Sequence, residues 1–142
     1  MHKPFYASGF LYHSPSQQIL LQQLTSDTEA KLVMFGSKSH NGENPITIFQ
    51  QCVEKALGIT IDTDSIRPIY DYTHDKFGEH FIFYIEIKDT IPVINSFNKK
   101  AEWLSLSKLS KFNMSEQTRH DITIGERVIR FNFESSQATL QS

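Results

Sequence analysis

Runs of apolar residues separated by polar stretches predict three strands in the first third of the chain. The segments 5–13 and 19–21 are apolar and lie on either side of a short turn, so we expect two adjacent strands. The apolar run 32–35 predicts a third strand after the polar stretch 25–31, which predicts a loop. The polar segment 36–44 contains two glycines, which favours a loop that turns sharply or approaches another group closely.

A helix is predicted between Pro45 and Gly58. Proline is favoured in the first turn of a helix, because its missing amide hydrogen has no partner there. Glycine is favoured just after the last turn. Between these two residues, apolar side chains recur at the spacing of one helix face: Ile46, Phe49, Val53 and Leu57.

The middle of the chain predicts further strands. The apolar segments 59–61, 66–72 and 80–87 predict strands, and the last two form a hairpin through the polar residues 73–79. The residues 89–100 predict an irregular connection.

The last part of the chain predicts a second helix. The residues 102–104 precede a short helical turn near 107–109. A final helix is predicted from 113–115 to about Phe131. The polar residues 134–142 are expected to form a frayed tail.

Strands on both sides of one strong helix, followed by more strands and a second helix, predict a mixed sheet with helices on both faces. The expected fold class is therefore α/β, with the architecture of an α/β/α sandwich. The 142 residues, of which 39% are hydrophobic and 21% charged, suit one globular domain with its own core. We expect this domain to span residues 1–131, with a flexible C-terminal tail at 132–142.

Charge and cysteine content narrow the range of partners and compartments. The net charge is −2, and lysine and arginine are scattered along the chain, which argues against long nucleic acids as partners. Cys52 is the only cysteine, which excludes an internal disulfide and favours a reducing compartment. The sequence contains no apolar run of about 18 residues that would predict a membrane span, and none of signal-peptide length at its start. A cytoplasmic location without a membrane partner is the expectation.

The segment 36–59 resembles the Nudix box, the signature of the Nudix (MutT-like) hydrolase family. The family pattern is G-x5-E-x7-R-E-U-x-E-E-x-G-U, where U is a bulky aliphatic residue. Aligned on the separation between its first glutamate and its last glycine, the pattern places these residues at Glu43 and Gly58. Its two aliphatic positions then fall on Val53 and Ile59. The resemblance implies a Nudix-type α/β/α sandwich.

Segments outside the box are similar to their counterparts in the family. The residues 7–9 followed by 19–23 look like the usual two-strand lead-in, and 34–36 look like the strand that enters the box. The residues 102–104 look like the tryptophan-bearing segment before the last helix. The resemblance thus covers roughly residues 4–131.

The residues that carry catalysis in the family are replaced in this chain. In working members, glutamates of the box helix hold Mg²⁺ against a pyrophosphate, and the metal neutralises charge and positions or activates the attacking water. The block R-E-U-x-E-E is replaced here by Gln51-Cys52-Val53-Glu54-Lys55-Ala56, which removes all three carboxylates of the pattern. The resemblance therefore implies a pyrophosphohydrolase fold with a degenerate metal box, in which we assign no catalytic residue, no metal ligand and no cofactor.

Neighbouring residues do not restore the metal site. At about 100° per residue, Cys52, Lys55 and Ala56 share one helix face, whereas Glu54 points about 200° away from Cys52. An ammonium about 4 Å from a divalent cation is repelled by roughly 8 kcal/mol at an effective dielectric near 20, so Lys55 also opposes a metal.

Glu43, Gln51 and Gly58 are expected to have structural roles in the box. The pattern's arginine, which partners the first glutamate in the family, is Gln51 here, and its amide can still donate a hydrogen bond to Glu43. We expect Glu43 to brace the box loop and Gly58 to cap the helix.

Phe35, Gly36 and Lys55 are the candidate ligand-binding residues. Lys55 offers a fixed ammonium that could replace the missing cation and bind a phosphate directly, and the alternative is a solvated lysine on a decayed site. Phe35 is the candidate pocket wall, because base stacking on aromatic rings is one mode of nucleotide recognition. The loop from Gly36 would form the pocket floor with Lys55. Cys52 is a soft metal ligand, a reactive thiol beside a cation, or a small packed residue.

Histidines and acids outside the box are further candidates. His40 in the box loop, and His74 and His80 around the hairpin with Asp75 and Glu79, could form a displaced metal or acid/base site. Their spacing matches no established metal motif, and the alternative is a solvated turn.

Three functions follow as hypotheses. The first is binding of a nucleotide or another phosphate-bearing small molecule with little or no hydrolysis. The second is an active pyrophosphohydrolase of nucleoside-diphosphate-linked substrates, with Mg²⁺ or Mn²⁺ held at a relocated site by some of Glu43, Asp75, Glu79 and Asp121. The third is a protein-interaction scaffold. The segment 119–121, which includes Asp121, is interpreted as helix surface, with a water-orienting or phosphate-facing acid as the alternative that the resemblance implies.

Overall fold

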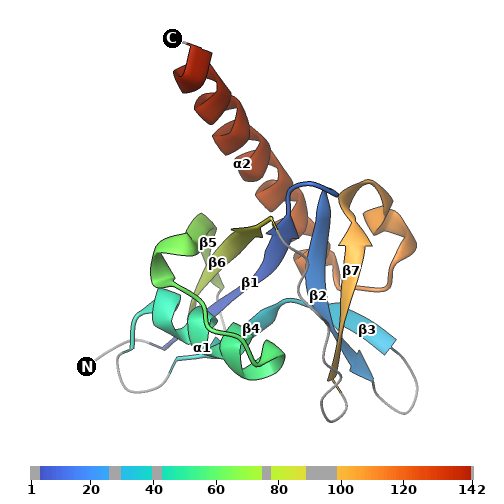
Figure 1. Ribbon diagram of the computed structural model, residues 1–142. Coiled ribbons are helices and arrows are strands. Elements are labelled where there is room, and N and C mark those ends of the chain that lie inside the picture. Colours follow the sequence, from blue (N-terminus) through green and yellow to red (C-terminus); the bar gives the residue numbers. More distant parts are fainter. Residues whose placement is uncertain (1–3, 26–29, 40–42, 75–77, 89–98, 142) are drawn as a thin grey trace.

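The computed structural model in Figure 1 describes residues 4–25, 30–39, 43–74, 78–88 and 99–141. The elements follow one another in the order β1 (Phe5–His13), β2 (Gln18–Thr25), β3 (Ala30–Val33), β4 (Phe35–Lys38), α1 (Pro45–Leu57), the 3-10 helix η1 (Thr63–Ser65), β5 (Ile66–His74), β6 (Gly78–Ile87), β7 (Lys99–Ser105), the 3-10 helix η2 (Leu106–Lys111) and α2 (Glu116–Gln141). No helix within these ranges is long and apolar enough to cross a membrane.

The strands form one mixed sheet with β1 near its centre. The sheet has the order β3-β2-β1-β6-β5, with β4 paired to β1 and β7 paired to β2. Strand β1 is antiparallel to β2 and β4 but parallel to β6, whereas β5 and β6 are antiparallel to each other. The mixed sheet that the sequence predicts is therefore confirmed.

The two α-helices cover opposite faces of this sheet. Figure 1 shows α1 in front of the strands and α2 behind them. Each helix closes its own apolar core. The core on the α1 side includes Leu11, Leu20, Phe35, Phe49, Val53, Leu57, Phe83 and Ile85. The core on the α2 side includes Phe10, Ile19, Leu21, Ile82, Tyr84, Leu104, Ile122 and Ile129. The α/β/α layering matches the expectation.

Helix α1 has the predicted bounds, and its ends are capped by identifiable groups. The Asn44 side chain accepts a hydrogen bond from the Thr47 amide at 2.8 Å, which satisfies one of the free amides of the first turn. Pro45 occupies the first turn. Gly58 ends the helix in the left-handed conformation, with φ of 67°, and its amide donates to the carbonyl of Glu54.

Two segments differ from the prediction. The residues 36–38 belong to strand β4 instead of a loop, because Gly36 lets β4 pack against β1: a Cβ there would lie 2.5 Å from the Cβ of Ser8. The residues 59–61 are not a strand. The side chains of Gln50 and Glu54 bind the Ile61 backbone there, at 2.7 Å to its oxygen and 2.8 Å to its amide.

Three further predictions concern connections and the last helix. Strands β2 and β3 extend into the predicted loop 25–31, of which residues 26–29 lie outside the described residues. Strand β7 begins inside the predicted connection 89–100, of which residues 89–98 lie outside the described residues. Helix α2 continues past Phe131 to Gln141, so the backbone of the predicted tail is helical over most of its length. The flexibility of 132–142 stays a prediction.

Candidate functional site

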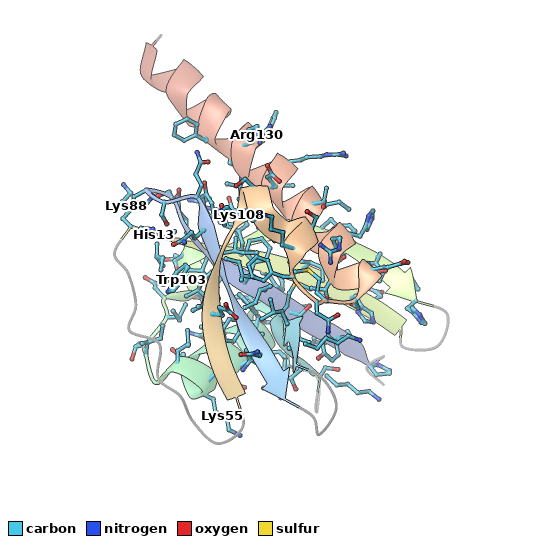
Figure 2. The ribbon with its side chains drawn as sticks, turned by 90° about the vertical axis from the view of Figure 1, so that its right-hand side faces the viewer. His13, Lys55, Lys88, Trp103, Lys108 and Arg130 are labelled. Atoms are coloured by element: carbon cyan, nitrogen blue, oxygen red, sulfur yellow. The ribbon has the colours of Figure 1, made fainter. Side chains whose placement is uncertain are left out.

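The positions that carry glutamates in a Nudix box lie on the flank and the outer side of α1. Cys52 and Ala56 are half-buried and pack against the core beneath the helix. Lys55 lies about 200° around the helix from the buried Val53 and is exposed. In Figure 2, the Lys55 side chain points away from the body of the molecule. The three residues therefore differ in exposure: Cys52 and Ala56 are half-buried, and Lys55 is exposed.

The side chains at these positions do not fit a magnesium ion. Mg²⁺ binds oxygen ligands in near-octahedral geometry, whereas Cys52, Lys55 and Ala56 offer a thiol, an ammonium and a methyl group. Within the described ranges, no group of three or more histidine, cysteine, aspartate or glutamate side chains is placed to hold a metal ion. We therefore derive no metal-dependent step from this site.

The structure places the other predicted residues of the box at different points around α1 and β4. Phe35 has no exposed surface, because its ring is packed in the core under α1, which corrects its expected place on a pocket wall. Gly36 makes its close approach to strand β1. Glu43 is half-buried and Gln51 is exposed, and no hydrogen bond joins them among the contacts of the described residues. Gly58 has the predicted capping role.

Aromatic rings and a histidine meet on the α2 side of the sheet, in a group that we call the Tyr–His cluster: Tyr6, Tyr70, Tyr72 and His80. His80 is the register partner of Tyr6 on β1 and of Tyr72 on β5. Its ring stacks on both, with centroids 5.4 Å from Tyr6 and 4.8 Å from Tyr72. Tyr70 stacks on Tyr72 at 5.5 Å. The cluster thus forms a continuous row across three strands.

Asp121 anchors one end of this row from helix α2. Its carboxylate accepts hydrogen bonds from the Tyr70 hydroxyl and from the Gln117 amide, the latter at 2.8 Å. Asp121 is 1% exposed, so the expectation that it lies on the helix surface was wrong. Its neighbour Arg119 donates to the carbonyls of Leu109 and Phe112 and fixes η2 to α2.

Burial shapes the electrostatics of the Tyr–His cluster. It raises the pKa of Tyr72 to about 12, with a smaller contribution from the charge of Asp121, and it raises the pKa of Tyr70 above its usual value. Burial and the nearby His74 lower the pKa of His80, which favours its neutral form. The Tyr72 hydroxyl lies 3.2 Å from His80 Nδ1, and His80 Nε2 is buried without a hydrogen-bond partner within the described structure.

The cluster lies within electrostatic range of the box helix. Burial raises the pKa of the Tyr6 hydroxyl, and the charge of Cys52 raises it further. Tyr6 is 37% exposed, so this end of the row is open to solvent.

Those of the predicted histidines and acids that the structure describes do not assemble into a relocated metal site. His74 and His80 have ring centroids 6.1 Å apart, but Glu79 is exposed on β6 and is not grouped with them around a metal position. His40 and Asp75 lie outside the described residues. The sequence patterns around His80 and Asp121 gave no sign of the cluster, because its members come from three strands and Asp121 contacts it from a helix.

Solved structures similar to this chain have low sequence identity to it. A structure from a study of MutT from Aliivibrio salmonicida and Vibrio cholerae has a TM-score of 0.71 at 14% identity and covers 91% of this chain and 99% of that one. The Nudix domain of Shewanella oneidensis NrtR, complexed with ADP ribose, has a TM-score of 0.65 at 12% identity and covers 89% and 86%. The C-terminal domain of mouse MUTYH, in complex with human PCNA, has a TM-score of 0.70 at 10% identity and covers 91% of each chain.

No protein-family model and no curated protein matches the chain. The structural similarity nevertheless spans about nine tenths of it. The mixed sheet between two helices, with a box helix at the predicted residues, is therefore the Nudix (MutT-like) fold.

Proposed function

We propose that the protein binds a nucleotide or another small phosphate-bearing molecule on the Tyr–His cluster, with little or no hydrolysis. The observation that carries the proposal is the combination of an intact aromatic surface with a box flank that has no carboxylate. At the box positions of α1, neither Cys52 nor Ala56 offers an oxygen to a metal.

The rings of the cluster suit a ligand that contains a base. Tyr6, Tyr70, Tyr72 and His80 are all partly accessible, so a flat ring can pack against the end or edge of their row. Stacking of a base on an aromatic side chain contributes about 1–3 kcal/mol and tolerates different bases. This interaction needs no metal and no catalytic residue.

His80 supplies a hydrogen-bonding group that a ligand can use. Its lowered pKa favours neutral imidazole, and when Nδ1 accepts from the Tyr72 hydroxyl the proton resides on Nε2. A buried donor without a partner costs about 1–3 kcal/mol. A ligand acceptor that reaches Nε2 would remove this cost, which favours binding of a polar ligand over an apolar one.

Structural neighbours guide the choice of ligand. One neighbour is complexed with ADP ribose, and another, with a TM-score of 0.70 at 7% identity, is described as an ADP compounds hydrolase. Both support a nucleoside diphosphate as the first class to test. Lys55 is not part of the proposal, because its exposed side chain points away from the molecule.

Thermal shift and isothermal titration calorimetry with ADP-ribose and ADP test the proposal. A ligand present at ten times its dissociation constant stabilises the protein by about 1.4 kcal/mol, which corresponds to a rise in Tm of roughly 4 °C. Tyr6→Ala should weaken binding at least fivefold, because Tyr6 is the exposed end of the row. The matched control is Phe131→Ala, which removes an exposed ring from α2 and should leave the affinity unchanged. No shift with any nucleotide at millimolar concentration would contradict the proposal.

A second experiment restores carboxylates to the box and tests whether hydrolysis appears. The triple variant Cys52→Glu, Lys55→Glu and Ala56→Glu returns carboxylates to the box, and we expect feeble Mg²⁺-dependent hydrolysis of ADP-ribose from it and none from the parent chain. Strong Mg²⁺-dependent turnover by the parent would instead support the alternative of an active hydrolase with a relocated metal site.

A second candidate function is a protein-interaction module. Helix α2 projects from the body of the molecule (Figure 1), and Phe131 and Phe133 on it are 67% and 61% exposed. The MUTYH domain with the same fold is in complex with another protein. In this case nucleotides should cause no thermal shift, and Lys55→Ala should change only the surface charge.

A further inference from the structure

A hollow lies under the point where helix α2 leaves the sheet, and we call it the Phe133 hollow. Its volume is about 400 Å³, within the usual range of small-molecule sites. The residues that line it are Ser14, Arg67, Tyr84, Glu86, Lys88, Ile129, Asn132 and Phe133. It lies at the far end of β6 from His80, roughly 20 Å along the strand. Figure 2 shows Lys88 and Arg130 at this end of the molecule and Lys55 at the opposite end.

The floor and one wall of the hollow are held in place. Asn132 donates a hydrogen bond to the Tyr84 hydroxyl at 2.8 Å, which joins α2 to β6 across the floor. Tyr84 and Ile129 are 3% and 7% exposed, so both belong to the core. Phe133, one helical turn after Ile129, lines the hollow and is 61% exposed. The ring therefore offers an apolar surface that the protein itself does not cover.

The charges at the rim are not neutralised by one another. Arg67 on β5 and Lys88 after β6 are both exposed, and neither forms an ion pair with any described residue. Glu86 contributes one carboxylate between them. The ion pair of Arg130 and Glu126, at 2.7 Å, lies beside an adjoining hollow that shares Phe133 and Ile129. The Phe133 hollow thus combines two cations, one anion and an aromatic ring.

We infer that the Phe133 hollow binds a small organic anion built on an aromatic ring with an amino or N–H donor. Arginine and lysine receive the anionic group, because a guanidinium binds carboxylate or phosphate oxygens in pairs and an ammonium adds a second charge. Glu86 accepts from the donor, and Phe133 stacks on the ring. An aromatic amino acid and a nucleoside monophosphate both have this chemistry. This site is distinct from the Tyr–His cluster and does not depend on the proposed function.

Calorimetry and NMR titration of the full chain with AMP and with L-tryptophan test the inference. Saturable binding of at least one probe at submillimolar to millimolar concentration is expected, and its identity separates a phosphate source from a carboxylate source. Arg67→Ala should weaken binding about tenfold, and Phe133→Ala at least threefold. The matched control is Arg127→Ala, an exposed arginine of α2 that does not line the hollow.

Three results would overturn the inference. Equal affinity for AMP and for uncharged adenosine would show that the cations play no part, and an unchanged affinity in Arg67→Ala would place the ligand elsewhere. No saturable binding of either probe at millimolar concentration would also overturn it. Tyr6→Ala should leave binding in the hollow intact, so failure here and failure of the proposed function are separable.

Discussion

The hydrogen bond between Tyr70 and the buried Asp121 allows a quantitative test of the cluster. Tyr70→Phe removes the hydroxyl and keeps the ring that stacks on Tyr72. Asp121 is 1% exposed, so water cannot readily replace the lost donor, and Gln117 remains as the other donor. A hydrogen bond to a charged group contributes about 1.5–3 kcal/mol. We expect the free energy of unfolding of the variant to fall by about 2 kcal/mol at neutral pH.

The loss of stability in Tyr70→Phe should grow as the pH rises. Burial raises the pKa of Asp121, and the hydrogen bonds from Tyr70 and Gln117 partly oppose this. A carboxyl group with a raised folded-state pKa holds its proton more tightly when folded, so its contribution to stability falls as the pH rises from its ordinary value of 3.8 through the raised pKa. Removing the Tyr70 donor raises this pKa further. The variant should therefore lose stability more steeply with rising pH, and it should differ least from the parent at low pH.

Urea denaturation followed by circular dichroism, at several values between about pH 4 and pH 7, measures both effects. The control at pH 7 is Tyr72→Phe, which removes the hydroxyl that lies 3.2 Å from His80 Nδ1 and should cost about 0.5–1.5 kcal/mol. A double-mutant cycle with Asp121→Asn isolates the energy of the Tyr70 pair. If Tyr70→Phe stays within about 0.5 kcal/mol of the parent at pH 7, or shows the same loss at every pH, the reasoning is refuted.

Three further predictions each concern one residue. Gly125→Ala should destabilise the protein by about 1–3 kcal/mol in urea denaturation, because a Cβ there would lie 2.8 Å from the Phe10 ring. Glu54→Ala should cost about 1–2 kcal/mol in the same assay, because it leaves the Ile61 amide without its acceptor. In a spectrophotometric titration Tyr72 should stay protonated up to about pH 12, so fewer tyrosines ionise near pH 11 in the folded chain than in the unfolded chain.

Local rules explain which elements were predictable from the sequence. Helix α1 could be predicted because its apolar spacing, its first proline and its final glycine all act within one segment. The segment 59–61 was mistaken for a strand because its isoleucines are apolar, but its backbone bonds to side chains of α1 and not to another strand. Strand β4 looked like a loop because the reason for Gly36 is its contact with β1, which lies far away in the sequence.

The candidate site was less predictable because it depends on strand register. His80 meets Tyr6 and Tyr72 only because β1, β6 and β5 pair at those residues, and the sequence of each strand carries no sign of the other two. Asp121 was expected at the surface because acids usually are. The buried neighbours Ile122 and Gly125 were the signal that this side of α2 faces the core.

The fold and the chemistry of the box positions depend largely on different residues of α1. The residues that hold α1 on the sheet, among them Phe49 and Val53, are different from those at the metal positions, Cys52, Lys55 and Ala56. Replacing clustered carboxylates by neutral or cationic side chains removes repulsion between like charges and leaves the buried face untouched. Folding therefore places less demand on these positions than on the buried face, because Cys52 and Ala56 are only half-buried and Lys55 is exposed, and similarity of fold carries no information about hydrolysis. The decision between binding and catalysis rests on the chemistry of the side chains that face the ligand, which under the proposed function are the tyrosine rings and the imidazole of the Tyr–His cluster.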